Sequence, residues 1–193
     1  VSTHSVLYYA EDSLVTFYDD AQRLLAVYYK RRVEMLEDGL VSGILANQFM
    51  AGDNLVAYIS GRTKDFKVYY QGQTRVLESF NSGGTFKPGK DIVAYVNNAD
   101  QKFRIFYKGE IYDVEEFPPM GFVAGDGIVA YVDYSGYFKI FCDGEVTTIS
   151  TINPDFFKVV NRMVIYGERG YFNVWDDYRT YTLETYIPRE KDW

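Results

Sequence analysis

Apolar residues recur along this chain in short blocks separated by polar loops, and the pattern of blocks is repeated five times. The clearest copy runs from Asp91 to Glu115. It contains an apolar block, a polar loop, an aromatic-rich block, the pair Lys108-Gly109 and a third block. Alternating, β-branched and aromatic blocks of this length predict β-strands. The Lys-Gly pair indicates a tight hairpin turn, because glycine reaches positive φ without a steric penalty.

The first apolar pair of each copy sets the period of the repeat. Successive pairs lie 41, 37, 36 and 35 residues apart: Leu14-Val15, Leu55-Val56, Ile92-Val93, Ile128-Val129 and Met163-Val164. The third block follows the start of the second by nine residues in every copy. Strand registers resist insertions whereas loops accept them, so the constant spacing favours strands joined by hairpins.

A fourth, less regular apolar stretch lies in the link between copies. Examples are Val6–Tyr9, Gly43–Ala46, Gly121–Ala124 and Phe156–Val160. This stretch is short and flanked by Gly or Pro, which suits a crowded inner strand. Four strands in about 35–45 residues is the size of a β-propeller blade. We therefore predict an all-β fold, a β-propeller with five four-stranded blades, as a five-bladed ring or part of a larger propeller.

The repeat fills nearly all 193 residues, so we predict a single domain over residues 1–193. The predicted blades cover residues 1–38, 39–79, 80–116, 117–150 and 151–187. The tail at 188–193 is too short for another blade and is expected to be a linker or a clasp against the first blade.

The third block of a copy is expected to be the outermost strand of its blade. It ends in glutamate in four of the five copies: Glu37, Glu78, Glu115 and Glu184. We interpret these glutamates as edge charges, because a charge on an exposed strand blocks edge-to-edge pairing.

Composition narrows the classes of partner. The chain is 47% hydrophobic and 18% aromatic, which is enough to bury a core and excludes disorder. The net charge of −7 disfavours nucleic acid, since phosphate binding needs a basic surface. No apolar run approaches the roughly 18 residues of a membrane span. The start at Val1 without methionine predicts a processed chain and an extracellular or periplasmic location.

Residues that carry common chemistries are few. His4 is the only histidine and Cys142 the only cysteine, so a Ser/His/Asp triad, a multi-histidine metal site and a disulfide framework are disfavoured. No calcium or phosphate loop is present, and we predict no cofactor and no metal. The acids near predicted inner strands are Glu11, Asp12, Glu116 and Asp155, which do not recur at matching positions.

Aromatic residues are the remaining candidates for ligand binding. Neighbouring residues of the second block face opposite sides of a strand, so one series packs between blades and the other can be exposed. Exposed rings stack on sugars or anchor a protein partner. The candidate ligand-binding positions are Tyr29, Tyr70, Tyr107 and Trp175, with packing between sheets as the competing role.

The turn before the first block resembles that of the TolB-type, WD-like propeller repeats of secreted and periplasmic proteins. It reads Ala51-Gly52-Asp53-Asn54, Pro88-Gly89-Lys90-Asp91 and Ala124-Gly125-Asp126-Gly127, each followed by an apolar strand. Trp175-Asp176 is similar to the WD dipeptide and occurs once. The resemblance implies a propeller with an interaction role, and it carries over no catalytic residue.

Three functions follow as hypotheses. The leading one is a non-enzymatic extracellular or periplasmic propeller that binds a protein partner or assembles with itself. The alternative is a lectin-like propeller that binds carbohydrate between blades. A glycoside-active enzyme is the least favoured, and Glu116 and Asp155 are the first residues to test for it.

Overall fold

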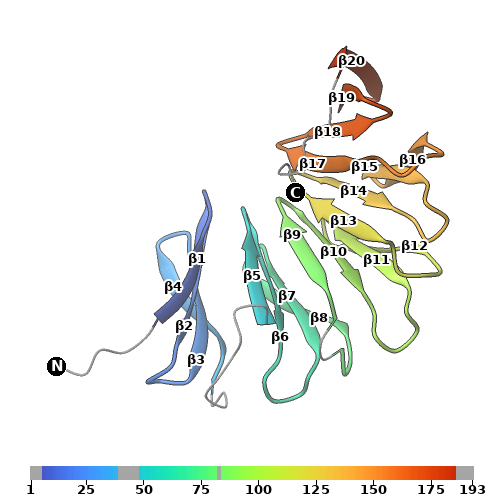
Figure 1. Ribbon diagram of the computed structural model, residues 1–193. Helices are drawn as coiled ribbons and strands as arrows, with labels where there is room; N and C mark the ends of the chain where they lie inside the picture. The colour runs from blue at the N-terminus through green and yellow to red at the C-terminus, as the bar shows by residue number, and fades with distance from the viewer. Residues whose placement is uncertain (1–5, 39–47, 82–83, 186–193) are drawn as a thin grey trace.

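The computed structural model describes residues 6–38, 48–81 and 84–185, and it shows five separate four-stranded antiparallel sheets (Figure 1). The strands of each sheet are ordered as in the sequence, so every sheet is an up-and-down meander. The predicted fold class is confirmed: the described residues form five four-stranded blades of an all-β propeller, as expected for a five-bladed ring or part of a larger propeller. Across these three described ranges, no helix has the length and apolarity needed to cross a membrane.

Each blade is built from four consecutive strands. Blade one contains β1 (Val6–Ala10), β2 (Leu14–Asp19), β3 (Leu24–Tyr29) and β4 (Arg32–Glu37). Blade two contains β5 (Phe49–Gly52), β6 (Leu55–Ile59), β7 (Phe66–Tyr70) and β8 (Gln73–Glu78). Blade three contains β9 (Phe86–Gly89), β10 (Ile92–Val96), β11 (Phe103–Tyr107) and β12 (Glu110–Glu115). Blade four contains β13 (Gly121–Ala124), β14 (Ile128–Val132), β15 (Phe138–Cys142) and β16 (Glu145–Ser150). Blade five contains β17 (Phe156–Val160), β18 (Met163–Glu168), β19 (Tyr171–Asp176) and β20 (Arg179–Thr185).

These five sheets fall one by one within the five predicted blade ranges, and the predicted tail at 188–193 lies outside the described residues. In blade two, the predicted inner strand at Gly43–Ala46 also lies outside them. The inner strand of that blade is β5 instead, so its predicted position was wrong. A two-residue turn after Gly52 brings Phe49–Gly52 alongside β6, with Phe49 opposite Tyr58.

The outer hairpin of every blade turns on two residues with positive φ, as a type I′ turn requires. Three of these turns carry glycine as their second residue, including the predicted turn at Lys108-Gly109. The end blades lack it and keep the same turn: Lys30 and Arg31 have φ of 48° and 65°, and Asp177 and Tyr178 have φ of 45° and 62°. The paired flanking strands therefore impose this backbone shape even on residues that disfavour it.

The first strand of each blade is the innermost one, and neighbouring inner strands contact one another near the centre of the arc (Figure 1). Glycine permits this approach. A side chain at Gly52 would overlap the carbonyl oxygen of Gly89, and a side chain at Gly89 would overlap that of Gly125. The expected crowding of the inner strands is confirmed, and it explains why glycine ends β5 and β9 and directly follows β13.

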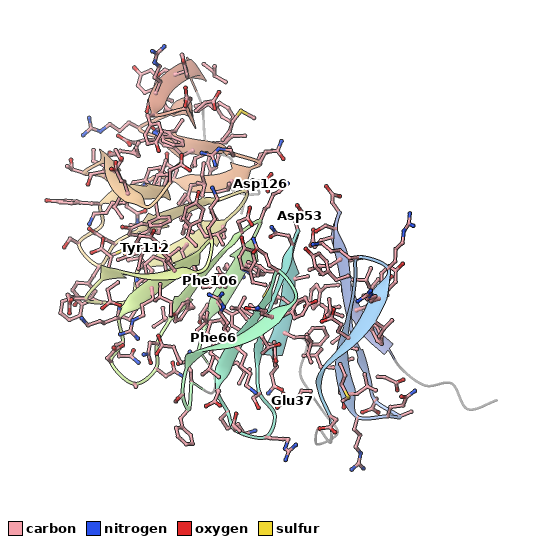
Figure 2. All side chains as sticks on the ribbon, turned by 180° about the vertical axis from the view of Figure 1, so that it is seen from behind. Glu37, Asp53, Phe66, Phe106, Tyr112 and Asp126 are labelled. Atoms are coloured by element: carbon pink, nitrogen blue, oxygen red, sulfur yellow. The ribbon has the colours of Figure 1, made fainter. Side chains whose placement is uncertain are left out.

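The hydrophobic cores lie between adjacent blades. Successive side chains of a strand face opposite neighbours. In β10, Val93 and Tyr95 pack against blade two, whereas Ile92 and Ala94 pack against blade four. A middle strand is therefore buried on both faces and needs an unbroken apolar run. Side chains fill the spaces between blades, as at Phe66 and Phe106 (Figure 2).

The blades form an open arc with blades one and five at its two ends (Figure 1). The arc has two rims. The link rim carries the blade-to-blade links and the loops between second and third strands, and Glu37 lies there (Figure 2). The opposite rim carries the remaining turns, including those of Asp53 and Asp126 (Figure 2).

Candidate functional site

The predicted aromatic positions lie within the packing between blades. Tyr70 and Tyr107 are buried, and their hydroxyl groups donate hydrogen bonds to Asp91 at 2.7 Å and to Asp143 at 2.9 Å. Tyr29 is partly buried and meets the ring of Tyr69 edge-on, with 6.0 Å between centroids. These rings therefore serve as packing groups, and their role in ligand binding stays a prediction.

Trp175 lies on the opposite face of its strand from the three tyrosines. It pairs with Val164 in β18, whereas Tyr107 pairs with Ile92, one position earlier in the equivalent strand. Trp175 is buried against blade four and meets Tyr178 at 5.5 Å. The four candidate positions thus do not form one equivalent series.

Three glutamates that end outer strands contact the next blade with their side chains: Glu37, Glu78 and Glu115. Glu37 accepts hydrogen bonds from the Ser60 hydroxyl and from the backbone N–H of Gly61, 3.2 Å away. Glu115 accepts a hydrogen bond from the Tyr131 hydroxyl at 2.9 Å. The interpretation as edge charges was wrong for Glu37, Glu78 and Glu115, because hydrogen bonds to the neighbouring blade occupy their carboxylates. The side chain of Glu184 lies outside the described part of the chain.

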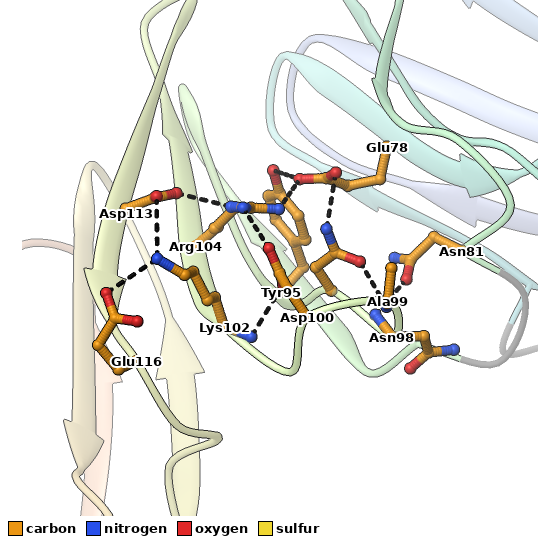
Figure 3. A network of polar contacts seen from close by, with 11 residues as sticks. Glu78, Asn81, Tyr95, Asn98, Ala99, Asp100, Lys102, Arg104, Asp113 and Glu116 are labelled. Carbon is orange, nitrogen blue, oxygen red and sulfur yellow. Dashed lines mark hydrogen bonds and ion pairs between the residues drawn. The ribbon is translucent and has the colours of Figure 1, made fainter.

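Glu78 is the centre of the most extensive of these contacts (Figure 3). Its carboxylate accepts hydrogen bonds from the Tyr95 hydroxyl at 3.0 Å and from the Asn97 amide at 2.8 Å. It also pairs with Arg104 at 2.7 Å, and Arg104 binds Asp100 and Asp113 at 2.6 Å each. Burial and the adjacent carboxylate of Glu78 raise the pKa of the Tyr95 hydroxyl, so it stays a neutral donor.

Blade four repeats this arrangement with a lysine. Lys139 pairs with Glu115 and with Asp133, both at 2.7 Å. Although burial opposes it, the hydrogen bond from Lys139 holds the pKa of Asp133 below its ordinary value. A glutamate of one blade, with a tyrosine and a basic residue of the next, therefore fixes two consecutive junctions.

The junction between blades four and five departs from this pattern. Ser150 stands in place of the glutamate and Asn173 in place of the basic residue. The result is a pocket of about 330 Å³ whose lining includes Tyr166, Tyr171 and Thr182. Tyr171 is exposed, and the Thr182 hydroxyl donates to Asn173 at 2.8 Å. This pocket presents one aromatic ring and several hydrogen-bonding groups to solvent.

An apolar patch lies on the link rim between blades three and four. We call Phe117, Met120 and Tyr134 the rim patch; their exposed fractions are 60%, 64% and 68%. The rings of Phe117 and Tyr134 lie 5.5 Å apart. Sequence reasoning missed this patch because its residues stand outside the repeated blocks.

A groove of about 480 Å³ borders the rim patch. Met120 belongs to both, and the groove continues over Pro118 and Pro119. Lys87 and Gln101 supply polar groups to its lining. The rim patch and this groove together offer apolar contact beside hydrogen-bonding groups, as protein-binding surfaces do.

The two carboxylates considered first for catalysis stand in different blade-to-blade links. Glu116 is exposed on the link rim and pairs with Lys102 at 2.9 Å. Asp155 precedes β17 in blade five, and its backbone N–H donates to Gly167. Within residues 6–38, 48–81 and 84–185, no group of three or more His, Cys, Asp or Glu is placed to hold a metal ion. His4 lies outside the described residues.

Solved structures share the fold at low sequence identity. The CRINKLY WD40 ectodomain of the Arabidopsis thaliana receptor kinase ACR4 is 12% identical with a TM-score of 0.56, covering 96% of this chain and 68% of that one. The ectodomain of the Physcomitrella patens receptor kinase CR4 is 9% identical with a TM-score of 0.51, covering 93% and 53%. Prp20p from Saccharomyces cerevisiae is 8% identical with a TM-score of 0.50, covering 89% and 58%. At such identities the likeness shows the fold alone.

Comparison by sequence with curated proteins finds no match. The model of one protein family, described as the 10-bladed beta propeller domain, matches residues 1–192. Because that match covers nearly the whole length, the chain belongs to the ten-bladed β-propeller domain family.

Proposed function

We propose that this protein is a non-enzymatic propeller that binds a protein partner through the rim patch. The observation that carries the proposal is the exposure of Phe117, Met120 and Tyr134 side by side with a groove. Large apolar side chains gathered on a surface mark interaction sites, and aromatic residues supply most of the binding energy there. Two similar structures are receptor-kinase ectodomains, and that of Prp20p was described with its binding to Gsp1p and histones.

The groove suggests the form of the bound segment. Its volume of about 480 Å³ and its lining by Met120 and two prolines suit an extended loop or peptide that places an apolar side chain against the prolines. Lys87 and Gln101 would then bind its backbone carbonyl groups. The resemblance to TolB-type repeats favours an extracellular or periplasmic partner, and fractionation of the native cells tests that location.

The test is capture of partners from native extract by the unaltered chain and by a Phe117→Ser/Tyr134→Ser double variant. We expect a specific partner that the double variant loses. Phe80→Ser is the matched control, because Phe80 is exposed on the same rim but follows blade two. A set of partners that the double variant retains in full would contradict the proposal, provided circular dichroism shows that all three proteins are folded.

The pocket between blades four and five favours a second candidate function, carbohydrate binding. Tyr171 offers a ring for stacking on a sugar, and Ser150, Asn173 and Thr182 lie in the same lining with groups that can bind sugar hydroxyls. Titration calorimetry with a panel of oligosaccharides tests this function. Binding that Tyr171→Ala removes would support it, and a panel without binding would eliminate it.

A further inference from the structure

An aromatic triad joins three of the four pairs of consecutive blades, and between blades one and two Leu25 takes the place of its phenylalanine. A phenylalanine at the start of one blade's third strand, here called the knob, meets two rings of the next blade, here called the socket. Between blades two and three, the knob Phe66 lies 5.0 Å from Phe86 and 4.9 Å from Tyr95. The next two junctions repeat the triad as Phe103 with Phe122 and Tyr131, and Phe138 with Phe157 and Tyr166.

Among the described residues, none fills the socket of blade one as a knob. Tyr8 pairs with Phe17 across β1 and β2, as Phe86 pairs with Tyr95 in blade three. Tyr8 is 64% exposed and Phe17 is partly exposed, whereas the rings of the equivalent pair are buried. Tyr28, next to this socket, is 43% exposed. The face of blade one that points away from blade two is therefore built like the faces that are buried elsewhere in the arc.

Within the described part of the chain, the knob of blade five has no socket in a following blade. Phe172 stands directly before the bulge between the third and fourth strands, the position that Phe66 and Phe138 occupy in their blades. Phe66 and Phe138 are fully buried, whereas Phe172 is partly exposed. The two ends of the arc thus carry the complementary halves of one contact.

The end faces are also opposite in charge at a matching point. Between blades three and four, Tyr107 donates to Asp143, the first residue of the next blade's outer turn. Asp176 occupies the position of Tyr107 in blade five, and Lys30 occupies the position of Asp143 in blade one. Both side chains are exposed, and the Lys30 ammonium group, which lies 5.0 Å from the centroid of the Tyr29 ring, has to turn towards the end face to meet Asp176. Joining the two end faces as the inner blades are joined would place Asp176 beside Lys30.

We propose that a second copy of this chain covers the end faces, so that blade five of each copy docks on blade one of the other. Two arcs then close a two-fold symmetric ring of ten blades, the number by which the family is described. The occupant is a second copy because the knob, socket and charges repeat a contact already made within the chain. Closure also removes both exposed end faces. This proposal is independent of the rim patch.

Native mass across a wide range of protein concentrations is the first test. Light scattering of the 193-residue chain should give twice the 22.3 kDa chain mass, with dissociation only on dilution. A monomer at every concentration would overturn the proposal, whether the arc stays open or its own tail covers an end face. Open-ended growth would overturn it as well, since the ring would not be closed.

Two variants and their mixture test the assigned contact. Phe17→Glu spoils the socket and Phe172→Glu spoils the knob, so a dimer of either variant has two damaged junctions. We expect the dissociation constant of each to rise about thirtyfold or more, as for other buried interface aromatics. An equimolar mixture retains one undamaged junction and should dimerise more tightly than either variant alone. Tyr134→Glu on the rim patch is the matched control and should dimerise normally.

Failure of the mixture to recover would overturn the contact, as would normal dimerisation of both single variants. Circular dichroism of the monomers separates lost docking from lost folding.

Charge reversal tests the register of the two end faces independently. Lys30→Glu and Asp176→Lys should each weaken the dimer, and the double variant should restore it because the ion pair reforms with its charges exchanged. A double variant no tighter than the single ones would overturn the register.

Discussion

Replacing Glu78 with alanine separates two accounts of the glutamate that ends an outer strand. If the side chain only guards an exposed edge, its removal should change the free energy of unfolding by less than about 0.5 kcal/mol. In the structure, it accepts hydrogen bonds from Tyr95 and Asn97 and pairs with Arg104 (Figure 3). We therefore expect a large loss of stability.

The size of this loss follows from the surroundings of the carboxylate. The side chains of Glu78 and Arg104 are each 15% exposed, so solvent screens the pair only weakly. Removing one partner of a buried pair costs about 3–5 kcal/mol. Arg104 keeps Asp100 and Asp113, which lowers the cost, whereas the buried Tyr95 hydroxyl loses the hydrogen bond to Glu78. We expect a loss of about 3 kcal/mol, with hydrogen bonds to charged groups at about 1.5–3 kcal/mol each as the guide.

Urea unfolding followed by circular dichroism measures this loss, and thermal unfolding should show a fall of roughly 6–12 °C for a chain of this size. Glu145→Ala is the matched control, because Glu145 is an exposed glutamate on the outer strand of blade four. The loss of stability in Glu78→Gln should lie between those of Glu78→Ala and Glu145→Ala, since glutamine keeps a hydrogen-bond acceptor but loses the charge. Equal stability of Glu78→Ala and Glu145→Ala would refute the reasoning.

Four further outcomes are expected. Gly89→Ala should cost about 3 kcal/mol in urea unfolding, because its side chain would overlap the next inner strand. Phe103→Ala, which empties a fully buried position, should cost about 3–5 kcal/mol by the same measurement. Burial raises the pKa of Tyr70 to about 12, above the unfolded value of about 10. The stability gained from neutral tyrosine is therefore complete below about pH 10 and should fall in urea melts as the pH rises towards 12. Burial also raises the pKa of the Cys142 thiol, so a thiol reagent should react slowly with the native protein and quickly in urea.

The repeated blocks predict the strands well because each blade packs between neighbours in the same way, so equivalent strands need the same pattern of apolar residues. The Ile-Val-Ala-Tyr-Val block of β10 must bury both faces, and that need is visible as an unbroken apolar run. The inner strand of blade two was misplaced for a related reason. Phe49–Gly52 is only four residues long, and short apolar stretches in a long link look alike in sequence. Which stretch pairs with β6 is decided by the turn that follows it.

The role of the glutamates could not be predicted from one blade, because their partners belong to the next repeat. A signal was nevertheless present between repeats. Blades two and three end in glutamate, and the blades that follow them carry Arg104 and Lys139 at one shared position. Blade four ends in Ser150, and blade five carries the neutral Asn173 there. An acid and a base that appear and disappear together in neighbouring repeats indicate a contact between them.

In a repeat protein, an aromatic residue that recurs at equivalent positions indicates shared packing rather than a shared binding site. A residue such as Tyr70 or Tyr107 recurs because every junction must be filled, and the structure buries it accordingly. Phe117 and Tyr134 occur in one link and one loop, where no repeated contact requires a large apolar side chain. Exposed aromatic residues outside the repeat are therefore better guides to a binding surface than the aromatic positions that recur. The end faces combine both features. Tyr8 and Phe172 stand at recurring positions, but among the described residues no neighbouring blade covers them as it covers their counterparts.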